Sequence, residues 1–446
     1  MFACMGAWCC YASECNVSAQ TTESLFTSAV PFLIPHDVQE PPLLCHAAAH
    51  LLLSLSKNVK FSRDPMTLLG DLYHHAQRSL HYLEPKTAGV VREALVSLAL
   101  SRGPSNLAAS EAAKTLISSW ANTLPSLGPK VALPPLTTLL LAFADASTHA
   151  KKIIAEGVQV AAQTALRMLC EPAYSAAEAE VTEFFLALFT ALLPQLGKFA
   201  YIAIDTFLEV AQRECGESEG SVERVVECVR LGVEAGGGGV RVRAVLQLLH
   251  GHVLPRAHAH APALARAAHR ALASVMIYRW RYFFPHQCET EERTRRLDEL
   301  RGALTALGSA LMQTDIELLR IVLNTLDVLN TKWKLYYKAV FRGEFLGSFL
   351  SVLLSGLAEG GARALLRDEA VGCVHAMSVV DFPAFRAAFL PHFLAALPLE
   401  PHHVAALADF PPDTDLPTFT QNILRLMNDV NCCRVYGNIA LPAISS

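Results

Sequence analysis

The chain has 446 residues, of which 52% are hydrophobic and 17% are charged, and its formal net charge is −4. This length exceeds the roughly 250–300 residues at which a single hydrophobic core stops growing, so we expect several domains or an open stack of repeats. The composition is too apolar for a disordered chain. Because basic residues are not in excess, nucleic-acid binding is not expected.

The apolar content raises the question of membrane spans, because the mean hydropathy is +0.30. The densest apolar run, Phe184 to Leu193, ends at Pro194, and no run approaches the roughly 20 continuous apolar residues that a bilayer crossing needs. We therefore expect the apolar side chains to be buried between helices, with no membrane insertion. The N-terminus lacks the basic and apolar regions of a secretory signal, which favours a cytosolic or nuclear compartment.

In chain order, the first 40 residues show no interpretable pattern, and residues 41–233 are predicted to form helical repeats. Residues 234–270 are rich in Gly, Ala, Arg and His and are predicted to be a variable stretch. Residues 271–436 are predicted to form C-terminal helical repeats, and residues 437–446 a tail. The helical prediction rests on apolar residues at steps of three and four, as in Val181, Phe184, Phe185, Leu188, Phe189 and Leu192, and again in Ile316, Leu319, Leu323, Leu326 and Trp333.

Proline and glycine residues divide these helices at a regular spacing. The predicted joints include Pro41-Pro42, Pro85, Pro125 with Pro129, Pro134-Pro135, Pro194, the Gly236–Gly239 run, Pro255, Pro285, Gly343, Gly360-Gly361 and Pro398. Ser105 and Asp381, the latter followed by Pro383, are predicted helix starts. Two helices of about 15–22 residues with their turn give about 40, the period of HEAT and armadillo arrays. We therefore predict an all-α, HEAT/armadillo-like helical-repeat solenoid built from antiparallel helix pairs.

Cysteine and histidine groups are the first candidates for a metal site. Cys4, Cys9, Cys10 and Cys15 are close in sequence, but they lack the paired Cys-x₂₋₄-Cys spacing of zinc knuckles. His46 and His50 share one helix face, yet Ala47 stands where a zinc protease has its glutamate base. We interpret them as a packed histidine pair. A longer histidine tract, which lacks acidic or thiol partners, is made of His250, His252, His258, His260 and His269.

Sequence signatures of catalysis are equally weak. The Gly236–Gly239 run is not followed by Lys-Ser or Lys-Thr, and no strand is predicted before it, so it is not a phosphate-binding loop. The pairs Glu291–Arg295 and Glu292–Arg296 are predicted to lie on a solvated helix face. We therefore expect a chain that is not an enzyme, with no catalytic residues, no cofactor and no metal.

One segment differs in kind, because aromatic and basic residues alternate at the end of a predicted helix. It contains the candidate partner-binding residues Lys332, Trp333, Lys334, Tyr336 and Tyr337. Two of the aromatic side chains could be core while the lysines extend to solvent, and this interpretation is somewhat favoured. The alternative is a recognition patch for an acidic or amphipathic partner, because aromatic residues carry much of the binding energy at interfaces.

Three stretches carry a resemblance to a known family. They are Leu329-Asn330-Thr331-Lys332-Trp333-Lys334-Leu335-Tyr336, then Val380-Asp381-Phe382 with Phe385, Ala388-Phe389-Leu390-Pro391 and Phe393-Leu394, and last Asp415-Leu416-Pro417-Thr418-Phe419-Thr420-Gln421-Asn422 with Arg425-Leu426 and Asn428-Asp429. They resemble the C-terminal end of a nuclear export receptor of the importin-β (karyopherin) superfamily. The specific match covers about the last 120 residues, and the string Cys45-His46-Ala47-Ala48-Ala49-His50-Leu51 is similar to a more interior part.

The resemblance implies a helical superhelix that wraps a protein cargo. It further implies export of profilin–actin in complex with GTP-bound Ran, shuttling between nucleus and cytoplasm, and a monomeric receptor. The family's N-terminal Ran-binding repeats should precede this region, so we expect a C-terminal part of a longer receptor. Cys432-Cys433 stands where the family has an aromatic pair. The alternative function is a non-catalytic HEAT/armadillo-type scaffold without Ran coupling.

Overall fold

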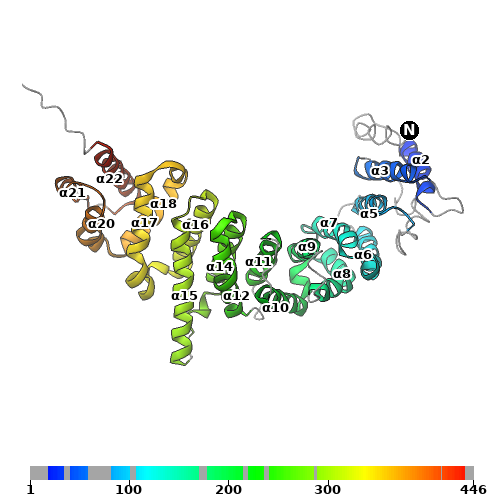
Figure 1. Cartoon of the computed structure of the whole chain (residues 1–446), viewed down its shortest axis with the longest axis horizontal. Coiled ribbons are helices and arrows are strands. Elements are labelled where there is room, and N and C mark those ends of the chain that lie inside the picture. Colours follow the sequence, from blue (N-terminus) through cyan, green and yellow to red (C-terminus); the bar gives the residue numbers. More distant parts are fainter. Residues whose placement is uncertain are drawn as a thin grey trace, which may run out of the picture. The chain divides into compact units, whose positions relative to one another are not determined.

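The computed structural model describes residues 19–34, 41–58, 82–100, 107–169, 178–213, 219–235, 241–285, 289–412 and 414–436. Every regular element in these ranges is helical, which confirms the predicted all-α repeat fold (Figure 1). The chain divides into two compact units, Met1–Val240 and Arg241–Ser446. Predictions made for Cys4, Cys9, Cys10, Cys15, Ser105, Gly236–Gly239 and the tail 437–446 lie outside the described residues.

The N-terminal unit is a double layer of helices. Its elements are α2 (Ala19–Ala29), η1 (Val30–Leu33), α3 (Pro42–Asn58), α5 (Pro85–Leu100), α6 (Leu107–Leu127), α7 (Pro129–Ala142), α8 (Thr148–Leu169), α9 (Glu178–Leu196), α10 (Lys198–Arg213) and α11 (Glu219–Glu234). Helices α5, α7, α9 and α11 pack in succession as one layer, and α6, α8 and α10 form the other. Each helix therefore buries its apolar stripe against neighbours close in sequence, as expected for a repeat array.

Aromatic and small residues fill this unit. Phe185 on α9 lies at the centre of an aromatic cluster, with its ring centroid 5.6 Å from that of Phe184 and 5.0 Å from that of Phe207 on α10. Between α6 and α8, Gly157 allows close approach, because a Cβ at this position would lie 3.0 Å from the carbonyl oxygen of Lys114. The packing of this unit thus depends on shape complementarity.

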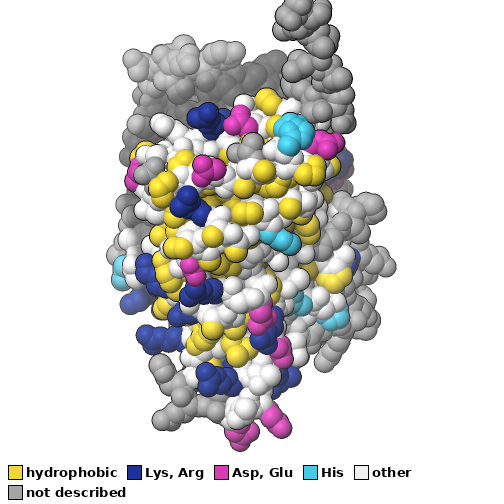
Figure 2. Space-filling model, turned by 90° about the vertical axis from the view of Figure 1, so that its left-hand side faces the viewer, with side chains coloured by type: hydrophobic (Ala, Val, Ile, Leu, Met, Phe, Trp, Pro, Cys, Tyr) yellow, Lys and Arg dark blue, Asp and Glu magenta, His cyan; other side chains and the backbone are white. Residues whose placement is uncertain are grey.

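The C-terminal unit is also built of helices that alternate along the chain, with short 3₁₀ and π-helical segments among them. Its elements are α12 (Val242–Leu248), η3 (Leu249–Val253), α13 (Leu254–His260), α14 (Pro262–Tyr278), η4 (Trp280–Tyr282), α15 (Thr290–Leu311), α16 (Ile316–Trp333), η5 (Leu335–Tyr337), η6 (Phe341–Phe345), α17 (Leu346–Glu359), η7 (Gly361–Leu366), α18 (Arg367–Ser378), η8 (Val379–Asp381), α19 (Phe382–Ala384), η9 (Phe385–Phe389), α20 (Leu390–Ala396), α21 (Pro401–Leu407) and α22 (Leu416–Tyr436). Helices α14, α16, α18 and α22 pack in succession, and α15 contacts α17. On the face that Figure 2 presents, hydrophobic side chains are exposed over much of the middle, with charged side chains among and below them.

Several prolines that were predicted to end helices lie inside them, so these predictions were wrong. Pro125 and Pro194 fall in the last turns of α6 and α9, and Pro134 and Pro135 lie within α7. A proline inside a helix costs about 3 kcal/mol. Each fully buried leucine contributes about 1.5–3 kcal/mol, and α7 buries four of them, Leu133, Leu136, Leu139 and Leu140. Packing therefore outweighs the backbone penalty.

Three helices of the C-terminal unit contain a π-helical turn, at Leu249–Val253, Phe341–Phe345 and Phe385–Phe389. The second holds Gly343, so this glycine, predicted as a joint, lies within a helix that continues to Glu359. A π-turn inserts one extra residue into an α-helix. Sequence periodicity does not signal it, because the apolar spacing changes only locally.

The structure also corrects the expectation about membrane-spanning lengths. By length and composition alone, the helical stretches Glu178–Leu196, Phe341–Glu359 and Ala364–Ala396 would be long and apolar enough to cross a membrane. The first qualifies because Pro194 does not end α9. Of its apolar window 56% is buried inside the protein, against α7, α8 and α11 among others. That none of these stretches enters a membrane stays a prediction.

A candidate protein-binding surface at the ends of α14 and α16

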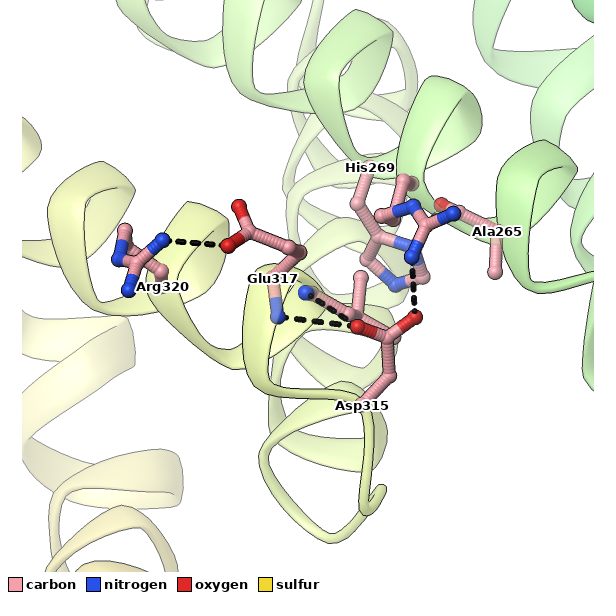
Figure 3. A network of polar contacts seen from close by, with 7 residues as sticks. Ala265, His269, Asp315, Glu317 and Arg320 are labelled. Carbon is pink, nitrogen blue, oxygen red and sulfur yellow. Dashed lines mark hydrogen bonds and ion pairs between the residues drawn. The ribbon is translucent and has the colours of Figure 1, made fainter. Parts of the chain in front are cut away.

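Helices α14 and α16 lie side by side and are joined near the start of α16. Asp315 caps α16 by accepting hydrogen bonds from the backbone N–H groups of Glu317 and Leu318, at 2.9 and 3.1 Å. Its second carboxylate oxygen accepts a hydrogen bond from Arg266 of α14 at 3.0 Å (Figure 3). One carboxylate thus sets both the beginning of α16 and its position against α14.

At the C-terminal ends of the same helices, two tryptophans stack. The rings of Trp280 and Trp333 have centroids 6.2 Å apart and an interplanar angle of 11°. The indole N–H of Trp333 donates to the carbonyl oxygen of Ile277 at 3.1 Å, which satisfies one of the open carbonyls at the end of α14. Trp280 is buried and also contacts Phe284, with centroids 5.0 Å apart. The pair therefore forms a fixed base between the two helix ends.

The structure divides the five residues of the sequence-predicted patch into two groups. Trp333 is half-buried in the stack, and Tyr336 is 1% exposed beside Phe341. Burial raises the pKa of the Tyr336 hydroxyl above its ordinary value. Lys332, Lys334 and Tyr337 are exposed instead. The interpretation of two aromatic side chains as core thus applies to Trp333 and Tyr336, while the other three face solvent.

Three further residues belong to the surface. Tyr278 and Arg281 were missed from the sequence, whereas Lys338 ends the alternating aromatic and basic segment that begins at Lys332. Tyr278 and Arg281 are exposed at the end of α14, and Lys338 is partly exposed after η5. The signal was present, because Tyr278-Arg279-Trp280-Arg281-Tyr282 alternates aromatic and basic residues as Lys332-Trp333-Lys334 does. We call Tyr278, Arg281, Lys332, Lys334, Tyr337 and Lys338 the basic-aromatic surface.

Cations and aromatic rings are paired around this surface. The Lys332 ammonium lies 5.4 Å from the ring centroid of Tyr278, and the Lys338 ammonium lies 5.6 Å from that of Phe284. Both distances fall within the range of cation–π attraction. Lys334, at the C-cap of α16, has a left-handed backbone with φ of 55°, which turns the chain sharply into η5. The cations thus sit at two helix C-termini, where the helix dipole favours positive charge.

The neighbouring helix α15 holds its own charges in pairs. Arg296 bonds Glu292 at 2.6 Å and lies 4.6 Å from the Tyr282 ring centroid. The Tyr282 hydroxyl donates to Glu299 at 2.7 Å, and burial and this carboxylate raise its pKa. The predicted Glu292–Arg296 pair is thereby confirmed, but it is partly buried against Tyr282, so its placement on a solvated face was wrong. The predicted partner of Arg295 was wrong, since Arg295 pairs with Glu292 and Glu299 in place of Glu291.

The histidine groups take structural positions. His46 Nδ1 lies 3.1 Å from the Thr87 hydroxyl, and the His50 and His46 Nε2 atoms lie 3.1 Å apart, in line with the packed pair. In the later tract, His269 is buried with Nδ1 2.8 Å from the Ala265 carbonyl oxygen. No group of three or more His, Cys, Asp or Glu among the described residues is arranged to hold a metal ion. The side chains of Cys45, Cys228 and Cys373 are buried, and none of the three is in a disulfide.

Residues 276–436 match the family model described as exportin-6, C-terminal TPR repeats. By this match, the C-terminal part of the chain is similar to the C-terminal repeats of exportin-6. All six residues of the basic-aromatic surface lie inside the exportin-6 match. The family description names tetratricopeptide-type repeats, which are also helix pairs but have a shorter period, about 34 residues, than the HEAT or armadillo type that we predicted.

Curated exportin-6 proteins are similar over a longer stretch. Exportin-6 of Homo sapiens is 30% identical over 321 residues, which is 66% of this chain and 28% of that protein. Exportin-6 of Danio rerio is 30% identical over 285 residues, 59% of this chain and 25% of that protein. The chain thus spans between a quarter and a third of the length of these relatives. Among solved structures, an engineered protein has a similar fold, with a TM-score of 0.50 at 14% identity, covering 91% of this chain and 99% of that one.

Proposed function

We propose that the chain is part of a nuclear export receptor and carries protein cargo from nucleus to cytoplasm. The observation that carries this proposal is the match of residues 276–436 to the exportin-6 C-terminal repeats, extended by similarity to exportin-6 proteins over 66% of the chain. A stack of helix pairs suits this role, because it offers a long surface of small repeated elements to a folded partner. The protein would act by binding alone, without catalysis or a cofactor.

The proposed cargo is profilin–actin, and the proposed regulator is GTP-bound Ran. Cargo and Ran would bind cooperatively in the nucleus and separate after GTP hydrolysis in the cytoplasm, so the receptor would shuttle between the two compartments. Such cooperation corresponds to a coupling free energy of about 1–3 kcal/mol between the two ligands. The exposed members of the predicted patch, Lys332, Lys334 and Tyr337, are part of the proposed partner-contacting surface.

The proposal is tested by capture on the immobilised chain. Profilin–actin is applied alone, with Ran locked in its GTP form, and with GDP-bound Ran as the matched control. Capture that rises roughly five-fold or more with GTP-bound Ran, but not with the GDP form, is the expected result for a coupling of this size.

Two other outcomes would change the conclusion. Capture of profilin–actin that ignores Ran would favour a static helical-repeat scaffold that binds cargo without the switch. If neither condition gives capture, and the same holds for a full-length exportin-6 relative tested in parallel, the cargo assignment fails.

A further inference from the structure

We propose that the basic-aromatic surface binds an acidic segment of a partner protein, in which carboxylates alternate with aromatic or aliphatic side chains. This proposal goes beyond export, because it concerns one face of the repeats and holds whether or not the chain cooperates with Ran. The proposed ligand at the ends of α14 and α16 is an acidic and partly apolar protein segment.

The first support is that the positive charges of this surface have no carboxylate partners within the described part of the chain. Arg281, Lys332, Lys334 and Lys338 form no ion pair with any residue in the described part of the chain. On α15, Glu299 accepts from Tyr282 and Glu292 pairs with Arg296, so these two carboxylates have partners of their own. Other arginines of this unit form ion pairs between helical segments, as Arg301 does with Glu344 and Arg342 with Asp381. Four open cations on one surface therefore stand out in a chain whose net charge is −4.

The second support is the exposure of two tyrosines, Tyr278 in contact with Lys332 and Tyr337 next to Lys338 in the sequence. Tyr278 is 51% exposed and Tyr337 is 55% exposed. Exposed aromatic rings at interfaces supply large contact area for a small loss of side-chain freedom. Since Lys332 already lies against the Tyr278 ring, a bound carboxylate would reach the ammonium while an apolar neighbour covers the ring. The surface thus matches alternating acidic and apolar residues.

The third support is rigidity of the base beneath the surface. The Trp280–Trp333 stack and the bond from the Trp333 indole to Ile277 fix the two helix ends relative to each other. The left-handed conformation of Lys334 fixes the turn that presents Tyr337 and Lys338. A preformed arrangement lowers the entropic cost of binding, which otherwise cancels most of the gain from exposed charge pairs.

Nucleic acid is the less suitable occupant of this surface. Trp280 is buried, and its ring covers one face of the Trp333 ring, so the pair offers little ring surface to a base. Four cations are also few compared with the phosphate contacts that give nucleic-acid binding its affinity. An acidic protein segment needs only two or three carboxylates and gains from the tyrosines.

The test uses the full chain and a fluorescent peptide in which glutamates alternate with leucine and phenylalanine. The control peptide has glutamine at every glutamate. Binding is followed by fluorescence anisotropy at about 0.05 M and about 0.5 M salt, because exposed charge pairs are screened over this range. We expect the acidic peptide to bind at low salt, roughly ten-fold or more weaker binding at high salt, and no binding of the glutamine peptide.

Variants connect the binding to this surface. The double variant Lys332→Glu/Lys334→Glu should weaken binding roughly ten-fold or more, and Tyr337→Ala roughly three-fold, while circular dichroism stays unchanged. The matched control is Lys152→Glu/Lys198→Glu, which reverses two exposed lysines of the N-terminal unit and should leave binding intact.

Three results would overturn the proposal. They are no binding of the acidic peptide at low salt, an equal loss in the control variant, and stronger binding of a single-stranded oligonucleotide than of the peptide. The peptide assay contains neither Ran nor profilin–actin, so its failure is distinguishable from failure of the export function. Intact peptide binding, together with absence of cargo capture by this chain and by the full-length relative, would reject the cargo assignment and keep this surface.

Discussion

The two units hold their helices together in different ways. In the N-terminal unit, small residues allow helices to touch along their backbones, as Gly157 does against Lys114. In the C-terminal unit, specific side chains join the helices, including the Trp280–Trp333 stack and the Arg266–Asp315 pair. We therefore expect added volume at Gly157 to destabilise the first unit, and loss of the Trp280–Trp333 or Arg266–Asp315 contact to destabilise the second. The exportin-6 match falls in the unit with the specific side chains.

The largest expected effect comes from removing a central aromatic ring in either unit. Trp280→Ala should destabilise the C-terminal unit by about 3–5 kcal/mol, and Phe185→Ala the N-terminal unit by a similar amount, because both side chains are buried. Urea unfolding followed by circular dichroism should show that each variant lowers the midpoint of its own transition. Trp280→Phe is the milder control. Equal shifts of both transitions by one variant would contradict the division into two units.

The next largest effect is expected from Gly→Ala substitutions, whose cost in stability should differ between the two units. Gly157→Ala should cost about 1–3 kcal/mol, because the new Cβ would meet the Lys114 carbonyl oxygen at 3.0 Å. At Gly308 the obstacle is the Phe349 ring at 3.2 Å, which can shift, so Gly308→Ala should stay within about 1 kcal/mol of the parent. Gly89→Ala, with nothing within 4 Å of its Cβ, is the control and should stabilise slightly. Thermal melts give the ranking, and a harmless Gly157→Ala would refute the close-packing account.

A smaller effect is expected at the start of α16. Asp315→Ala removes the N-cap and the Arg266 pair and should cost about 1–2 kcal/mol of unfolding free energy in the C-terminal unit. Asp315→Asn keeps a capping oxygen and loses the charge, so it should cost less than half as much. If the two variants were equal in urea unfolding, the ion pair and not the cap would be the dominant contribution.

The smallest expected effect is a pH dependence confined to the C-terminal unit. Burial in the π-turn lowers the pKa of His250, helped by His269 and opposed by Glu299. The unfolded chain therefore binds a proton at this residue more readily, so stability should be full at neutral pH and fall as pH drops below the ordinary histidine value of about 6.5. Melts at pH 7 and pH 5 should show this loss in the parent and a smaller one in His250→Gln. An identical loss in both would exclude His250 as the source.

Sequence alone predicted the helical architecture because apolar spacing reports directly which side chains are buried. Val181, Phe184, Phe185, Leu188 and Leu192 are all buried as the spacing implies. The prolines led to wrong helix ends. The cost of a proline to a helix can be read from the sequence, but the burial of side chains that offsets this cost depends on neighbouring helices. The same limit explains the π-turns, which have no compositional marker.

The candidate surface was half predicted for a related reason. Lys332 to Tyr337 form one local string, so their composition was noticeable, but Tyr278 and Arg281 lie more than fifty residues earlier in the sequence. The fold brings the two strings together, through the stacking of Trp280 on Trp333, the bond from Trp333 to Ile277 and the contact of Lys332 with the Tyr278 ring. The sequence also did not decide which aromatic side chains are buried. Tyr336 and Tyr337 are adjacent, and it is the turn after Lys334 that directs Tyr336 inward and Tyr337 to solvent.

Because of the π-turn at Phe341–Phe345, the number of residues in this helix determines which side chains contact its neighbours. Each residue advances the side-chain direction of an α-helix by about 100°, and a π-turn adds one residue. Phe341, where the turn begins, packs on Tyr336 with centroids 5.2 Å apart, and Phe349 beyond it lies against Gly308 of α15. Loss of a single codon here would restore a regular helix and rotate one of these rings away from its partner. In this segment the number of residues is therefore under structural constraint, in addition to their identity.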